Sequence, residues 1–275
     1  MTGWAVLVSE VMLQQTPVAR VEPVWRDWME RWPTPSELAS STLAEVLRRW
    51  GQLGYPRRAR NLHLAAQIIH TDHGGQVPMD LDLLLALPGI GSYTARAVLC
   101  FAGHERHPVV DTNVSRVVAR WHHGLAAGGA WGQKVALGHT AETLRDVPDK
   151  AYPEASVALM ELGALVCTAK SPSCGACPLQ DVCQWRARGF PVDPHTLPRG
   201  QARYEGSDRQ ARGVILHALR STPGGLDEEA LQTLWPTRSQ FRRALDSLLR
   251  EELVVEETVV EDTAIEVRRF RLPGD

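Results

Sequence analysis

Four of the five cysteines in this chain lie within 17 residues, and this spacing limits what the chain can fold into more than any other feature. Cys167, Cys174, Cys177 and Cys183 form the pattern C-x6-C-x2-C-x5-C, and Cys100 stands apart in an apolar stretch. The N-terminal residues MTGWAVLVSE lack the basic segment and long apolar segment of a signal peptide. We therefore expect a cytoplasmic protein, in which disulfides are rare and four clustered thiols indicate a metal site.

The composition is that of a folded protein with no membrane partner. Of the 275 residues, 44% are hydrophobic and 23% are charged, which excludes a mainly disordered chain. No apolar run reaches the roughly 18 residues that a membrane helix needs. The formal net charge is only −2, so a nucleic-acid site has to be a local patch.

The first 165 residues have helical periodicity and no alternating strand pattern. Prolines and capping residues mark the helix starts, and Thr42 with Glu45 three residues later has the capping-box pattern. Helices are expected over 4–15, 18–32, from 35, from 41 or 42 to 51, 57–74, 80–87, 91–101, from 111, 133–146 and 152–166.

The last part of the chain changes character. Residues 186–207 are rich in Gly, Pro and Arg and have the composition of a linker. Beyond them we expect helices over 208–220, 227–234 and 238–250, then two strands, 253–260 and 264–272, joined at Glu261-Asp262. Three helices followed by a β-hairpin predict a winged-helix arrangement.

The segment LPGIGSYTARAV, residues 87–98, predicts a tight Gly-x-Gly hairpin between two helices. Glycines permit such a turn without Cβ clashes, and backbone amides at the start of the second helix suit a DNA phosphate. Leu87, Pro88 and Ile90 would fix the hairpin to the core. The alternative is an ordinary connection between helices, since Gly-rich turns are common.

The hairpin, an Asp about twenty residues later and the cysteine loop resemble the helix-hairpin-helix DNA glycosylases of the endonuclease III superfamily. SEVMLQQT (9–16), WGQLGYPRRARNLH (50–63) and VVDTNVSRVVAR (109–120) resemble the adenine glycosylase branch, the MutY type. The resemblance covers roughly residues 4–190.

This resemblance implies a mainly α fold, with a helix-hairpin-helix core and an iron–sulfur loop, followed by a small α+β winged-helix-like domain. We expect four parts, with these bounds: a six-helix glycosylase domain over 1–106, a cluster domain over 107–190, a linker over 191–207 and a winged-helix-like domain over 208–275.

The cysteine loop is similar to the family's iron–sulfur loop, and so implies a [4Fe–4S] cluster held by Cys167, Cys174, Cys177 and Cys183. A structural zinc site is the alternative, although zinc ribbons favour paired C-x2-C units and only Cys174 and Cys177 form one. The loop between the first two cysteines contacts DNA in the family, which makes Lys170 the matching cation here. A solvated surface lysine is its other interpretation, and Cys100 is most simply a core thiol.

The resemblance implies catalytic roles for two carboxylates. Glu10, inside an apolar segment, would be the general acid that protonates adenine at N7, and Asp111 would stabilise the cationic sugar. Asn113 would orient the site. The plainer interpretations are a surface glutamate, a helix N-cap and a polar first-turn residue, respectively.

Tyr93 stands where endonuclease III has the lysine that forms a Schiff base with the sugar. A tyrosine cannot do so, and we expect a monofunctional glycosylase whether Tyr93 acts in catalysis or only packs.

Other positions match residues that contact DNA in the family. Gln15 and Tyr55 match positions that probe the duplex beside the lesion. Arg57, Arg58 and Arg60 follow, and are expected to meet phosphates or to be simply solvated. Glu161 matches a position that recognises the adenine edge, and is otherwise a surface carboxylate. The hairpin residues Leu87, Gly89, Ile90 and Gly91 complete the expected DNA interface.

The sequence departs from the family at both ends. The family has a helix and a Pro-Trp-Arg segment upstream of the position of Met1, and its usual C-terminal module is a Nudix-like domain that recognises 8-oxoguanine. Residues 201–275 are too short for that module. Opposite-base specificity is then expected to rest near Gln15 and Tyr55, with the tail's Arg238, Arg242 and Arg243 as further candidates for DNA contact.

The expected protein is a monomeric adenine DNA glycosylase of the bacterial cytoplasm and nucleoid, acting on double-stranded DNA with A·8-oxoguanine or A·G mispairs. The alternatives are a thymine or uracil mismatch glycosylase and a catalytically impaired protein that only binds mispairs.

Overall fold

The structure is a computed structural model that describes residues 1–128, 131–192, 203–260 and 266–275. The chain divides into two compact units, each built from segments distant in sequence. Unit 1 comprises Met1–Leu7, Met79–Ala86 and Ile90–Gly200, and unit 2 comprises Val8–Pro78, Leu87–Gly89 and Gln201–Asp275. None of the helices in the described ranges combines the length and apolarity needed to span a membrane.

The N-terminal helices confirm the expected pattern. They are α1 (Gly3–Leu13), α2 (Val18–Arg31), α3 (Pro35–Ala39), α4 (Leu43–Trp50), α5 (Arg57–Asp72), α6 (Leu81–Ala86) and α7 (Ser92–Phe101). The capping box, however, is at Thr34 and Glu37 of α3. Thr42 accepts from the Glu45 amide as expected, but the Glu45 carboxylate accepts from Arg31.

The core of unit 2 contains three fully buried tryptophans. The rings of Trp28 and Trp32 lie 4.9 Å apart between centroids, and those of Trp28 and Trp50 lie 5.5 Å apart, both edge to face. Aromatic pairs prefer this geometry. The contact between Trp28 and Trp50 therefore joins α2 to α4.

The remaining helices of unit 1 are α8 (Thr112–Val118), α9 (Gln133–Thr143), α10 (Tyr152–Glu161) and α11 (Gln184–Ala187). Two π-helical turns, η1 (Ala119–His123) and η3 (Leu162–Val166), extend α8 and α10. The expected helix over 152–166 thus changes its hydrogen bonding after Glu161. Cys100 is a fully buried core thiol, as expected, and burial raises its pKa.

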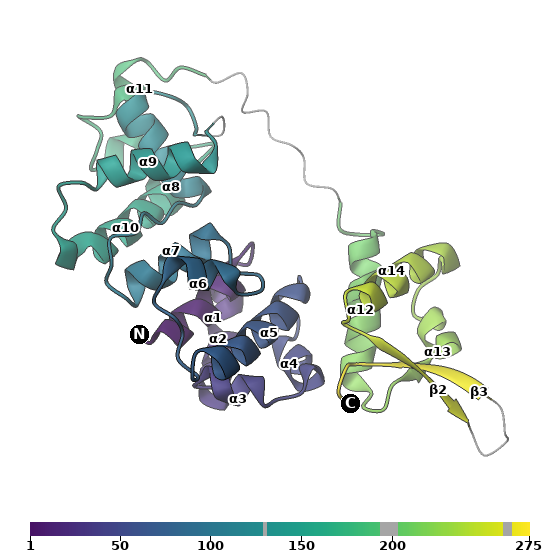
Figure 1. The fold of residues 1–275 in the computed structure, drawn as a ribbon. Coiled ribbons are helices and arrows are strands. Elements are labelled where there is room, and N and C mark those ends of the chain that lie inside the picture. Colours follow the sequence, from purple (N-terminus) through teal and green to yellow (C-terminus); the bar gives the residue numbers. More distant parts are fainter. Residues whose placement is uncertain (129–130, 193–202, 261–265) are drawn as a thin grey trace. The chain divides into compact units, whose positions relative to one another are not determined.

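The C-terminal segment of unit 2 has the order of a winged helix (Figure 1). Its elements are α12 (Asp208–Ser221), β1 (Leu226–Asp227), α13 (Glu228–Thr233), α14 (Arg238–Arg250), β2 (Val255–Val260) and β3 (Glu266–Arg271). The antiparallel sheet has the order β1-β3-β2, with Glu257 opposite Arg269. The sequence did not predict β1, because two residues are too few to show alternation. The expected joint at Glu261-Asp262 lies outside the described residues.

The hairpin glycines yield a stability prediction. Gly89 has a φ of +76°, and a Cβ there would lie 2.8 Å from Asn61 Cβ, whereas Gly91 has a φ of −97° and open space around it. Gly89→Ala is expected to lower the free energy of unfolding by about 1–3 kcal/mol. Gly91→Ala is the matched control and should change it little. Urea unfolding measures both, and equal effects would contradict this account of the turn.

Candidate functional site

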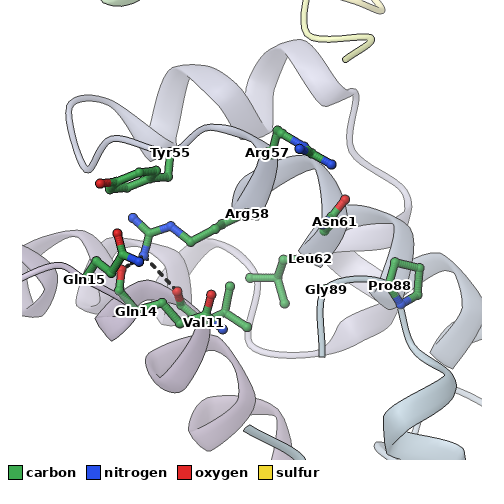
Figure 2. A pocket seen from close by; sticks show the side chains of 10 residues that line it. All are labelled: Val11, Gln14, Gln15, Tyr55, Arg57, Arg58, Asn61, Leu62, Pro88 and Gly89. Atoms are coloured by element: carbon green, nitrogen blue, oxygen red, sulfur yellow. Dashed lines mark hydrogen bonds between the residues drawn. The ribbon is translucent and has the colours of Figure 1, made fainter. Parts of the chain in front are cut away.

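A cavity of about 270 Å³ in unit 2 brings together several of the expected DNA-contacting residues (Figure 2). Its lining comes from the end of α1, the start of α5 and the hairpin. The lining residues are Val11, Gln14, Gln15, Tyr55, Arg57, Arg58, Asn61, Leu62, Pro88 and Gly89. Five of the residues proposed from sequence, Gln15, Tyr55, Arg57, Arg58 and Gly89, thus surround one hollow.

Gln15 and Tyr55 both have left-handed backbone conformations. Their φ angles are +56° and +49°, and both side chains are exposed. A residue with a Cβ loses about 1–2 kcal/mol in this region. Such strain persists only where surrounding contacts determine the backbone, and it gathers at functional sites.

Arg58 does not have the phosphate-contacting position expected for it. Its guanidinium donates to backbone oxygens of Val11 (3.0 Å), Met12 (2.8 Å), Gln14 (2.6 Å) and Gly54 (3.1 Å). Burial lowers its pKa to about 10. Arg60 forms an ion pair with Glu252, so it is not simply solvated, and its contact with a phosphate stays a prediction. Arg57 is exposed on the rim of the cavity, as a phosphate contact requires.

The hairpin residues divide by role. Leu87 and Ile90 are buried, which confirms their expected attachment to the core. Of the two glycines, only Gly89 needs its freedom of backbone conformation, since Gly91 is extended. Gly91 is the N-cap residue of α7 and provides no side-chain cap for that helix.

Glu10 lies on α1 with only 8% of its surface exposed, so it is not the surface glutamate of the plainer interpretation. A carboxyl group taken out of water in this way is costly unless it is hydrogen-bonded or protonated. Its sequence neighbours Val8, Val11 and Met12 are buried as well.

Asp111 caps α8, and its side chain begins a hydrogen-bonded series. One carboxylate oxygen accepts from the Val114 amide at 2.7 Å, and the other accepts from the Asn113 amide nitrogen at 2.9 Å. The Asn113 oxygen accepts from Arg116 at 2.8 Å. Both the N-cap interpretation and the orienting position of Asn113 therefore fit this geometry.

Arg116 continues the series to the cysteine loop. It donates to the carbonyl oxygens of Gly163 at 2.6 Å and Cys167 at 2.8 Å. Gly163 is packed so closely that a Cβ would lie 2.8 Å from Asn113 Cβ. Hydrogen bonds thus link Asp111 to the first cysteine of the loop through two side chains.

Three other residues proposed from sequence also belong to unit 1. Tyr93 is half-buried and packs against the core of unit 1. Glu161, the last residue of α10, and Lys170, in the cysteine loop, are both exposed.

The four loop cysteines line one hollow, together with Arg120 and Trp185. Desolvation is the largest cause that raises the pKa of Cys174, and the neighbouring thiols of Cys167, Cys183 and Cys177 raise it further. In the described parts of the chain, no three His, Cys, Asp or Glu side chains converge on a single-ion site. A [4Fe–4S] cluster differs in taking one thiolate at each of four separate irons, and the donor set fits it.

Arg120 is hydrogen-bonded to the cysteine loop. Although only 4% exposed, it donates to Cys167 Sγ (3.3 Å) and to the carbonyl oxygens of Thr168 (2.8 Å) and Ala126 (2.9 Å). Its guanidinium also lies 4.2 Å from the centroid of the Trp185 ring. Sequence reasoning missed the roles of Arg116 and Arg120. Two arginines four residues apart among the apolar residues of segment 112–120 could have indicated that they have partners inside the protein.

Comparison with known proteins agrees with this geometry. Residues 8–126 match the model of the HhH-GPD superfamily of base excision DNA repair proteins, and residues 167–183 match the iron-sulfur binding domain of endonuclease III. The fold and the cysteine loop therefore define a helix-hairpin-helix DNA glycosylase with a [4Fe–4S] cluster, and the matched iron-sulfur loop contains the four clustered cysteines.

The relatives narrow the class. The adenine DNA glycosylase of Mycobacterium tuberculosis is 52% identical over 274 residues, covering 99% of this chain and 86% of the relative. That of Mycolicibacterium smegmatis is 52% identical over 254 residues, covering 92% and 84%, and that of Homo sapiens is 41% identical over 189 residues, covering 68% and 34%. The chain belongs to the adenine DNA glycosylase family, and it is an enzyme of base excision repair that hydrolyses N-glycosyl bonds.

Solved structures of other members of the superfamily share the fold. A thermostable thymine-DNA glycosylase matches with a TM-score of 0.61 and 25% identity, covering 68% of this chain and 85% of that chain. A trapped endonuclease III–DNA covalent intermediate matches with a TM-score of 0.59 and 26% identity, covering 70% and 87%.

The contacts of Arg120 predict its effect on the cluster. Arg120→Leu leaves buried carbonyl oxygens without donors and should destabilise unit 1 by about 2–4 kcal/mol. Iron and acid-labile sulfide per purified chain should then fall well below wild type. Arg145→Leu removes an exposed arginine that pairs with Glu142 and should keep the full iron content. Normal iron in Arg120→Leu would show that this arginine does not hold the loop.

Proposed function

We propose that this enzyme removes adenine mispaired with 8-oxoguanine or guanine from double-stranded DNA in the bacterial nucleoid, as a monofunctional monomer. The observation that carries the proposal is the buried carboxyl of Glu10 within SEVMLQQT. A carboxyl group in largely apolar surroundings is the kind of group that serves as a general acid in glycosidic bond cleavage.

The proposed reaction uses two carboxyl groups and one water. Glu10 donates its proton to N7 of the extruded adenine, and the bond from the sugar C1′ to N9 breaks with its electrons passing to the base. Asp111 stabilises the positive charge on the sugar. Glu10, now a carboxylate, accepts a proton from the water that attacks C1′, so that adenine and an abasic sugar are formed.

The other residues bind and orient the DNA in this proposal. Asn113 holds the Asp111 carboxylate and is itself held by Arg116. Glu161 contacts the adenine edge. Gln15 and Tyr55 probe the duplex, with Arg57, the hairpin from Leu87 to Gly91 and Lys170 along its backbone. The cluster is a structural group that holds the loop around Lys170.

We also propose four parts of the chain: a glycosylase domain (1–106), a cluster domain (107–190), a linker (191–207) and a winged-helix-like domain (208–275).

Replacing the proposed acid tests the mechanism. Glu10→Gln should lower the single-turnover rate of adenine release from A·8-oxoguanine and A·G duplexes by about 10²–10⁴-fold, because the amide has no acidic proton. The affinity for these duplexes should remain. Glu30→Gln, at an exposed glutamate of α2, is the control and should react as wild type. Normal excision by Glu10→Gln would show that Glu10 is not the general acid. Release of thymine from T·G by the wild type would show that the substrate base is thymine.

The monofunctional character is tested by the products. Strand cleavage at adenine should require added alkali, because Tyr93 stands in the place of the lysine whose amine would form a Schiff base. Borohydride should therefore trap no covalent DNA complex with the wild-type enzyme. A trapped complex, or nicking before alkali, would contradict this part of the proposal.

A further inference from the structure

We infer that Arg58 is the positioning residue that holds Gln15 and Tyr55 in the conformations with which they meet the duplex. The inference rests on the proposed function, in which these two residues probe DNA. Figure 2 shows Arg58 extending between the turn that carries Gln15 and the segment that carries Tyr55.

On one side, Arg58 completes the end of α1. The last carbonyl groups of a helix have no partner within it, and Pro17 supplies no amide to continue the helix. The Nη1 atom of Arg58 donates to the carbonyl oxygens of Val11, Met12 and Gln14. A cation at a helix C-terminus is also favoured by the helix dipole. The residue next in the chain is Gln15.

On the other side, Arg58 holds the segment that leads to Tyr55. Its Nη2 atom donates to Thr16 Oγ1 at 2.9 Å and to the Gly54 carbonyl oxygen at 3.1 Å. The guanidinium carbon lies 5.5 Å from the centroid of the Tyr55 ring and 5.1 Å from that of the buried Trp50 ring. One charged group therefore fixes the backbone beside both left-handed residues and joins it to the core.

The same contacts separate Arg58 from an arginine that binds phosphate. Its terminal nitrogens already donate to protein oxygens, and burial lowers its pKa to about 10. A phosphate contact would add to the salt dependence of DNA binding, whereas a positioning role through Gln15 and Tyr55 would not.

The test is a double-mutant cycle on the full-length, iron-loaded enzyme. Adenine release from an A·8-oxoguanine duplex is followed over a range of enzyme concentrations in single turnover, which separates the half-saturating concentration from the maximal rate. Arg58→Met is expected to raise the half-saturating concentration about tenfold and to change the maximal rate less than about threefold. Arg58→Lys keeps the charge but makes fewer contacts, so its half-saturating concentration should lie between those of the wild type and Arg58→Met.

The second arm uses the background in which Gln15 and Tyr55 are both replaced by Ala. If Arg58 acts through them, Arg58→Met should raise the half-saturating concentration there less than about twofold. The salt slope of duplex binding should be the same for the wild type and Arg58→Met. Arg220→Met removes another buried arginine, whose pKa is also lowered to about 10 by burial, and should lower the melting temperature without changing the half-saturating concentration.

Two results would overturn the inference. An equal effect of Arg58→Met in both backgrounds would show a general structural role, and a salt slope lower by about one would show a phosphate contact. If Arg58→Met does not fold, the same cycle with Arg58→Lys decides the question. No effect of the two Ala replacements on their own would instead overturn the probing role in the proposed function, and the inference with it.

Discussion

Buried and half-buried guanidinium groups bonded to backbone carbonyl oxygens hold together the irregular parts of this enzyme. Arg58 donates hydrogen bonds to the end of α1, Arg116 to the π-helical turn after α10, and Arg120 to the cysteine loop. Carbonyl groups in such segments have no helical or sheet partner, and leaving them unbonded away from water is costly. Arginine suits this task, because it stays charged and has five donors in a rigid fork.

Most of the helices and the cluster ligands could be predicted, because their signals are local. The Thr42 cap, the start of α7 and the four cysteines are each fixed by spacing over a few residues. The tertiary partners could not be predicted. Nothing in the spacing of the three arginines after Tyr55 distinguishes buried Arg58 from exposed Arg57, because that difference arises from the carbonyl groups of a segment over 40 residues away.

The C-terminal segment shows the same limit. Its three helices and two longer strands followed from periodicity, whereas the short strand β1 and the pairing of charges did not. In the structure Arg242 lies 3.5 Å from Glu228, and Arg243 lies 3.2 Å from Asp208. Two of the three arginines expected to reach DNA from α14 therefore have acidic partners within the same segment, which weakens the case for DNA contact there.

The left-handed conformations of Gln15 and Tyr55 set stability against recognition. Selection or design for a more stable enzyme would favour glycine at both positions, because glycine adopts these φ angles without a Cβ penalty. Each such change would remove the side chain that faces the cavity. Engineering of this enzyme for heat tolerance should therefore leave both positions unchanged, since the gain in stability there would remove the side chains that we propose to probe DNA.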